Sequence, residues 1–123
     1  MEWINQDSTY MLLKKALDVC LLRHKVISNN IANVDTPGFK ASKVIFEEKL
    51  RAALNSNSNF SSEIRQIKPE VIQDNSPTQR EDFNNVDIEK EMVKLSQNTL
   101  YYNIYVQLLS EKLEMIREAI QSK

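Results

Sequence analysis

The stretch Ser28-Asn29-Asn30-Ile31-Ala32-Asn33-Val34-Asp35-Thr36-Pro37-Gly38-Phe39-Lys40-Ala41 decides how the rest of the chain is organised. It contains three asparagines, a Pro-Gly pair and the only glycine among 123 residues. Proline suits the second position of a type II turn and glycine the third, where φ is positive. We therefore expect a helix to end near Asn33 and the chain to turn at Pro37 and Gly38.

A long helix is predicted before this turn, over residues 8–34. Asp7 or Ser8 can cap its first turn, because a short polar side chain accepts hydrogen bonds from free backbone N–H groups. Its apolar residues alternate spacings of three and four, the heptad pattern that a coiled-coil partner requires. The predicted contact seam of this helix is Tyr10, Leu13, Leu17, Cys20, His24, Ile27, Ile31 and Val34.

A second long helix is predicted over residues 87–122. Asp87 suits its N-cap, and Glu89 and Glu91 follow near the positive end of the helix dipole. Two long helices with matching seams, one at each end of a short chain, can fold back as an antiparallel coiled-coil hairpin. The seam of the second helix is Ile88, Met92, Leu95, Thr99, Tyr102, Val106, Leu109, Leu113, Ile116 and Ile120.

The middle of the chain, residues 35–86, differs from both helices in composition. A short helix is expected over residues 42–54, followed by a linker rich in Asn and Ser over residues 55–62. Residues 64–72 alternate weakly in polarity and could form an extended segment. We therefore predict an all-α fold of one domain, residues 1–123, with a largely irregular and partly flexible middle.

Each predicted helix carries a second apolar stripe, two residues past the seam. Two residues correspond to 200° of rotation, so this stripe lies on nearly the opposite face. A hairpin buries one face of each helix, and the middle looks too polar to cover both, so the stripes predict packing between subunits. A closed homodimer or a four-helix bundle is the alternative. The second stripes are Leu12, Val19, Leu22 and Val26, and then Tyr101, Ile104, Leu108 and Met115.

Composition and motifs give no support for catalysis or for a bound cofactor. A net charge of −1 offers no general reason to bind nucleic acid or an anionic membrane. Cys20 and His24 could form a nucleophilic pair or begin a metal site, but the chain has only one Cys and one His, both on the seam. We expect a structural role for this pair, with no catalytic, metal-binding or cofactor-binding residues and no small-molecule substrate. The chain is therefore not predicted to be an enzyme.

The chain is expected to lack both a cleavable signal and a membrane span. Residues 1–7 have neither the basic nor the apolar region of a signal peptide. No run of about 18 apolar residues is present. Composition alone predicts a cytoplasmic protein, unless export uses a route that reads no cleaved signal.

The stretch from Ser28 to Ala41 closely resembles the N-terminal signature of bacterial flagellar axial proteins, the family that builds the rod and the hook. A second block, residues 84–92, and the tail, residues 108–113 and 116–120, are similar to the proximal rod members of that family. The short middle also fits a rod subunit better than a hook protein with its large inserted domain. One departure is Phe83, which stands where those chains commonly have a glycine. The signature residues are Asn29, Asn30, Asn33, Asp35, Thr36, Pro37, Gly38 and Phe39.

The resemblance implies a structural subunit of the proximal rod of the flagellar basal body. Such a subunit would leave the cytoplasm through the flagellar type III apparatus and transmit torque for motility from within the cell envelope. Its partners would be copies of itself, other rod proteins, the basal-body ring and the export gate. The amides of Asn29, Asn30 and Asn33 would then fix the turn or contact neighbouring subunits. A soluble helical binding module, such as an export chaperone or adaptor acting as a dimer, is the alternative.

Overall fold

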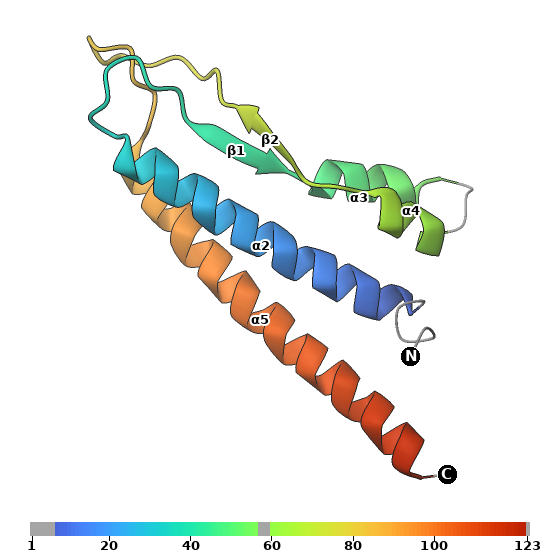
Figure 1. Cartoon of the computed structure of the whole chain (residues 1–123). Coiled ribbons are helices and arrows are strands. Elements are labelled where there is room, and N and C mark those ends of the chain that lie inside the picture. Colours follow the sequence, from blue (N-terminus) through green and yellow to red (C-terminus); the bar gives the residue numbers. More distant parts are fainter. Residues whose placement is uncertain (1–6, 57–59, 123) are drawn as a thin grey trace.

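Two long antiparallel helices and a shorter layer from the middle of the chain make up the fold (Figure 1). The computed structural model describes residues 7–56 and 60–122. Helix α2 spans Ser8–Ala32 and helix α5 spans Ile88–Gln121. The two helices lie side by side and run in opposite directions, which agrees with the predicted hairpin.

Both helices begin at the predicted caps. The Asp7 carboxylate accepts a hydrogen bond from the Tyr10 N–H at 2.9 Å, and the Asp87 carboxylate accepts one from the Lys90 N–H at 3.2 Å. Each bond satisfies a backbone donor that has no partner inside the helix. At the other end of α2, Asn33 is the C-cap, so this helix also ends where the sequence predicts.

The turn that follows α2 has the predicted form. The Phe39 N–H donates to the Thr36 carbonyl at 3.2 Å, which closes a four-residue turn around Pro37 and Gly38. Gly38 has a φ of 73°, the left-handed conformation that a type II turn requires at its third position. The chain therefore leaves the helix pair at a defined point and enters the middle layer.

The middle layer contains two strands and two short helices. Its strands form a two-stranded antiparallel sheet in which Ser42 lies opposite Gln73 and Ile45 opposite Glu70. The layer packs along α2, which lies between it and α5 in the view of Figure 1. The four elements are β1 (Ser42–Ile45), α3 (Glu47–Leu54), α4 (Phe60–Gln66) and β2 (Glu70–Gln73).

The strands correct the all-α prediction, which holds only approximately for this mostly helical chain. The helix expected over residues 42–54 divides into a strand and a helix, because Val44 and Phe46 are buried at the two-residue period of extended chain. The segment expected over residues 64–72 likewise begins inside α4 and becomes a strand only at Glu70. The linker expected over residues 55–62 lies partly outside the described residues.

The main apolar core lies between α2 and the middle layer. Val19 is 2% exposed, and Leu22 and Val26 pack against the same cluster from α2. This corrects the prediction that Val19, Leu22 and Val26 are free for packing between subunits. A few apolar anchors in an otherwise polar segment are enough to cover this face. The anchors are Val44, Phe46, Leu50, Ala53 and Ile67.

The face that α5 turns toward α2 is rotated from the predicted seam. Leu95, Leu109 and Ile116 are partly buried. Several other predicted seam residues are exposed, Met92 at 51% among them. On α2, Cys20 and Ile27 are buried, whereas His24 is exposed. The exposed members of the predicted seam on α5 are Ile88, Met92, Thr99, Tyr102, Val106, Leu113 and Ile120.

Polar residues spaced by seven cause this rotation. Glu91, Asn98, Tyr105 and Lys112 are buried or partly buried on the side of α5 that faces α2. The heptad spacing of these four residues gives α5 a polar line with the same period as its apolar stripe. The pattern of apolar residues alone therefore placed the contact face incorrectly.

Candidate functional site

Asn30 is the central residue of the signature and joins three elements. Its side chain is 1% exposed. Its Oδ1 accepts from the Ser42 N–H at 2.9 Å, and its Nδ2 donates to the Ser42 carbonyl at 2.8 Å and to Glu91 Oε2 at 3.0 Å. The amide thus binds the edge of β1 as a neighbouring strand would, and it also holds the start of α5. All its polar atoms are satisfied within the chain.

Arg23 continues this pattern two residues further along β1. Its Nη2 donates to the Val44 carbonyl at 3.1 Å, and its guanidinium binds both carboxylate oxygens of Glu47 at 2.6 and 2.5 Å. The bonds to Glu47 raise the pKa of Arg23 and lower the pKa of Glu47. Because Arg23 and Asn30 occupy the outer edge of β1, this edge cannot accept another strand.

Asn84 and Asn85 lock the turn from the opposite side. Asn84 Nδ2 donates to the carbonyls of Asn33 and Thr36, both at 2.9 Å. Asn85 Oδ1 accepts from the Ala41 N–H at 2.7 Å. The two sequence blocks that carry the family resemblance, residues 28–41 and 84–92, therefore bind each other within one chain.

The other signature residues divide between the turn and the surface. Asn33 Nδ2 donates to the Asn29 carbonyl at 2.8 Å, and the Thr36 hydroxyl donates to Asn33 Oδ1 at 3.1 Å. Phe39 is partly buried. Asn29, Asp35, Thr36, Pro37 and Gly38 are exposed. Asn30 and Asn33 thus have positions that fix the turn, whereas Asn29 stays at the surface.

Phe83 lies next to this network in an unusual conformation. Its φ is 63°, and it is the only non-glycine residue with positive φ among residues 7–56 and 60–122. Its side chain is 70% exposed. The left-handed geometry explains why a glycine suits this position, because L-residues with a Cβ adopt it at a steric cost.

Two further polar contacts set the register of the helix pair. Asn98 Nδ2 donates to the Cys20 carbonyl at 2.7 Å, and Lys112 Nζ lies 3.1 Å from Asp7 Oδ2. The polar line on α5 includes Asn98, Lys112 and Glu91. Each of these side chains contacts a partner in α2 or at its N-cap. The contact role of these residues was not predicted from the sequence, although their spacing of seven was a detectable signal.

Cys20 and His24 differ in exposure. Cys20 is buried and His24 is exposed, although both line one small pocket beside α5. Burial raises the pKa of the Cys20 thiol, whereas reactive cysteines have a lowered pKa. Within residues 7–56 and 60–122, no group of three or more His, Cys, Asp or Glu side chains could hold a metal ion.

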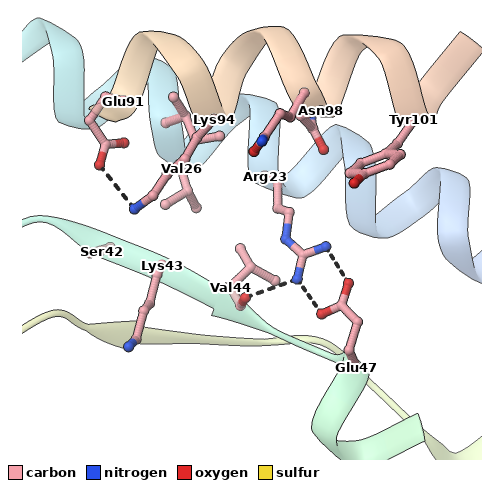
Figure 2. Close-up of a pocket in the computed structure, with 12 residues that line it drawn as sticks. Arg23, Val26, Ser42, Lys43, Val44, Glu47, Glu91, Lys94, Asn98 and Tyr101 are labelled. Atoms are coloured by element: carbon pink, nitrogen blue, oxygen red, sulfur yellow. Dashed lines mark hydrogen bonds and ion pairs between the residues drawn. The ribbon is translucent and has the colours of Figure 1, made fainter. Parts of the chain in front are cut away.

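A groove runs between α5 and the layer of β1 and α3, and α2 forms its floor. Figure 2 shows Arg23 reaching across it to Glu47, with the Tyr101 ring extending from α5 above the ion pair. One part, of about 320 Å³, is lined by polar and apolar residues that include Ser42, Lys94 and Asn98.

The other part of the groove has a volume of about 450 Å³ and is mostly apolar. We call it the apolar groove. Arg23 and Glu47 are the only charged residues among those that line it. The remaining lining residues are Leu12, Leu13, Ala16, Val19, Cys20, Phe46, Leu50, Tyr101 and Tyr105.

Two apolar stripes on α5 remain exposed, on opposite flanks of the line that faces α2. Within the described residues, no helix, α5 included, is long and apolar enough to cross a membrane. The first, the heptad stripe, consists of Ile88, Met92, Tyr102, Val106, Leu113 and Ile120. The second, the outer stripe, consists of Val93, Leu100, Tyr101, Ile104, Leu108 and Met115.

Comparison with known proteins gives these features a context. A sequence model described as "Flagella basal body rod protein" matches residues 21–40, within α2 and the turn. A flagellar basal body rod protein FlgB from Borrelia hermsii is 37% identical over an alignment 126 positions long, which covers 89% of this chain and 93% of that protein. Proteins of the same name from Aeromonas hydrophila and Bacillus subtilis are 30% and 29% identical. The alignment with the Aeromonas hydrophila protein covers 98% of this chain and 98% of that protein. The alignment with the Bacillus subtilis protein covers 93% of this chain and 94% of that protein.

Proposed function

Since the chain belongs to the FlgB family of flagellar basal body rod proteins, we propose that it is a subunit of the proximal rod. In this role it is exported by the flagellar type III apparatus and assembles into the helical drive shaft. The family is one of structural rod proteins and not of enzymes. Residues 1–123 act as a single rod-subunit domain, which binds copies of itself and other rod proteins.

The observation that carries the assembly role is the unburied apolar surface of α5. Fully burying a large apolar side chain stabilises an assembly by about 1.5–3 kcal/mol. Twelve such residues form the two stripes, and each is at least about one-third exposed. Even partial burial of both stripes would contribute several kcal/mol, and the isolated chain leaves this contribution unused. Exposed apolar surface on this scale marks an interaction site.

The heptad stripe also indicates what kind of partner covers it. Its successive members are four, ten, four, seven and seven residues apart along α5, so all of them fall on two positions of one seven-residue repeat, as in a coiled-coil seam. A flat or irregular partner would not require this repeat over the whole length of a helix. We therefore assign the heptad stripe to helices of neighbouring subunits, and the outer stripe to a second neighbour on the opposite flank.

In the cell, this subunit lies in the basal body, beside the membrane ring and the export gate. The rigid contacts within the chain suit a shaft that transmits torque. The intrachain bonds of Asn30, Asn84 and Asn98 fix the turn and the helix register. Because these amides are bonded within the chain, the stripes of α5 are the surfaces that we assign to neighbouring subunits.

Gene deletion with complementation tests the rod assignment. Deleting the gene should remove rods and swimming while the basal membrane ring remains, and the intact chain should restore both. Intact rotating flagella in the deletion strain would contradict the assignment. They would instead favour a soluble helical binding module, such as an export chaperone or adaptor, acting as a dimer.

A matched pair of variants tests the role of α5. Leu108→Asp places a charge in the outer stripe, whereas Gln107→Asp places the same charge at an exposed polar position next to it. We expect Leu108→Asp to keep its helical circular dichroism and lose complementation, and Gln107→Asp to restore swimming. Equal swimming in the two strains would show that the outer stripe is not an interface.

A further inference from the structure

The strained conformation of Phe83 calls for an explanation that the isolated chain does not provide. Its positive φ is needed to bring Asn84 into the turn network, but a glycine would adopt the same φ without steric cost. The phenyl ring itself is 70% exposed, the highest value among the exposed large apolar side chains of the described residues. The strain therefore keeps an aromatic side chain at the surface and not in the core.

The ring is presented on a rigid loop. The Phe83 N–H donates to the Arg80 carbonyl at 3.2 Å, and the Phe83 carbonyl accepts from Lys40 Nζ. On one side, the Asp82 carbonyl accepts from the Gly38 N–H at 2.7 Å. On the other, Asn84 is fully buried. A side chain on a backbone held in this way requires little further ordering of the loop on binding, which suits an interface anchor.

The apolar groove on the same molecule has the chemistry to receive such a ring. Its volume of about 450 Å³ leaves room for a phenyl group, and Leu12, Leu50 and Tyr105 are among its walls. Tyr101 and Tyr105 stack with their ring centroids 6.4 Å apart, so the inserted ring would meet aromatic partners.

Phe83 cannot fill the groove of its own chain. Its loop is fixed beside Asn33 at the end of α2 by the bond from Asn84 to the Asn33 carbonyl. The apolar groove lies along residues 12–23 of α2, roughly 20 Å away at 1.5 Å per helical residue. The Phe83 ring can therefore reach an apolar groove of this kind only on another molecule.

We propose that Phe83 of one subunit inserts into the apolar groove of a second copy. The occupant is assigned to a copy of this chain because one molecule carries both the exposed Phe83 ring, which is the knob, and the apolar groove that can receive it, which is the socket. Knob and socket lie on different parts of the surface, so the contact is heterologous. A heterologous contact that does not close into a ring continues as an open helical filament. The inference rests on the proposed rod function and names one contact between its subunits.

Photo-cross-linking tests this contact in assembled basal bodies. The probe is p-benzoylphenylalanine placed at position 83, which retains an aromatic ring there, in a strain without the native gene. Basal bodies are purified after irradiation, and linked peptides are identified by mass spectrometry. We expect links to residues 12–23 or 101–105, and the separation within one chain means that these links join two copies. Links only to other proteins, to other parts of a copy, or no links would overturn the proposal.

Two neighbouring tyrosines provide matched variants of the socket. Tyr101 lines the apolar groove, whereas Tyr102 lies on the other flank with Cys20 and His24. Both are exposed, so neither substitution empties the core. Tyr101→Ala should reduce the yield of links from position 83 roughly tenfold, as expected for loss of an anchor contact. Tyr102→Ala should leave the yield unchanged, and equal yields from the two variants would count against the groove.

Failure of this inference can be told apart from failure of the rod assignment. If the intact chain is present in purified basal bodies but position 83 links elsewhere, the rod function stands and the Phe83 contact is wrong. If the intact chain is absent from basal bodies, the rod function itself is wrong, and this contact falls with it.

Discussion

The side chain of Asn30 donates a hydrogen bond to Glu91 at 3.0 Å while both its polar atoms bind the backbone of Ser42. One buried amide thus connects the end of α2, the start of α5 and the edge of the sheet. This relationship explains why an asparagine in the signature is needed for the fold of the monomer, before any neighbour is bound.

We expect Asn30→Ala to lower the free energy of unfolding by about 2–4 kcal/mol. The substitution leaves the Ser42 N–H and carbonyl and the Glu91 carboxylate without their partner in a buried site, and each such loss costs about 1–3 kcal/mol. Urea unfolding followed by circular dichroism measures the change. The control is Asn29→Ala, because Asn29 is exposed, and its effect should stay below about 0.5 kcal/mol. Similar losses for both variants would contradict the role given to Asn30.

Phe83→Gly should stabilise the isolated subunit. Relief of the left-handed strain contributes about 1–2 kcal/mol, and the greater freedom of glycine in the unfolded chain offsets about 0.5–1 kcal/mol of it. The expected gain is about 0.5–1 kcal/mol in urea unfolding. Under the further inference, the same variant should assemble less well, so stability and swimming should change in opposite directions.

Gly38→Ala provides the reverse experiment at the other positive-φ residue. A Cβ built at Gly38, where φ is 73°, would meet no atom within 4 Å, so only the backbone conformation opposes the substitution. We expect a loss of about 1 kcal/mol in the free energy of unfolding. A neutral result would mean that the turn can change shape, and it would also weaken the strain argument for Phe83.

The Arg23–Glu47 pair should make stability depend on acid pH. Hydrogen bonding to Arg23 lowers the pKa of Glu47. A carboxyl group with a lowered pKa stabilises the fold above its unfolded value of about 4.3, and this contribution is lost as the pH falls through the lower folded value. Because Glu47 is largely exposed, the contribution should be below about 1 kcal/mol.

Urea unfolding of the native chain and of Glu47→Gln measures this contribution between pH 7 and pH 3. The native chain should be the more stable at pH 7, and the difference should disappear near pH 3. Glu48→Gln, a substitution of an exposed neighbour that does not bind Arg23, is the control. A constant difference between the native chain and Glu47→Gln over this range would exclude the ion pair as its cause.

The helices, their caps and the Pro-Gly turn could be predicted because each depends on a local signal. The capping bonds of Asp7 and Asp87 and the bond that closes the turn around Gly38 each join residues three positions apart. The sheet could not be predicted in the same way, because Ser42 and Gln73 are distant in sequence and the edge of β1 is satisfied by side chains of α2. Local alternation in such short segments is too weak to distinguish a strand from a helix.

The contact faces were harder to predict than the elements. The polar composition of the middle layer suggested that it could not cover both helices, but a few anchors around Val19 proved sufficient to cover one face of α2. On α5, apolar periodicity identified a stripe with coiled-coil spacing, whereas Glu91 and Asn98 occupy the face toward α2 because they have partners there. Most of the predicted seam of α5 is therefore exposed in the isolated subunit.

A pair of alanine substitutions on α5 tests this rotation. Leu95 is partly buried against the rest of the fold, so Leu95→Ala should lower the free energy of unfolding of the isolated subunit by about 2 kcal/mol. Met92 is 51% exposed, and Met92→Ala should lower it by less than about 0.5 kcal/mol. In the cell, Met92→Ala should nevertheless weaken swimming, because the heptad stripe is assigned to a neighbouring helix. If the large stability loss came from Met92 instead, the apolar seam would pair within the chain and the heptad stripe would not be available for assembly.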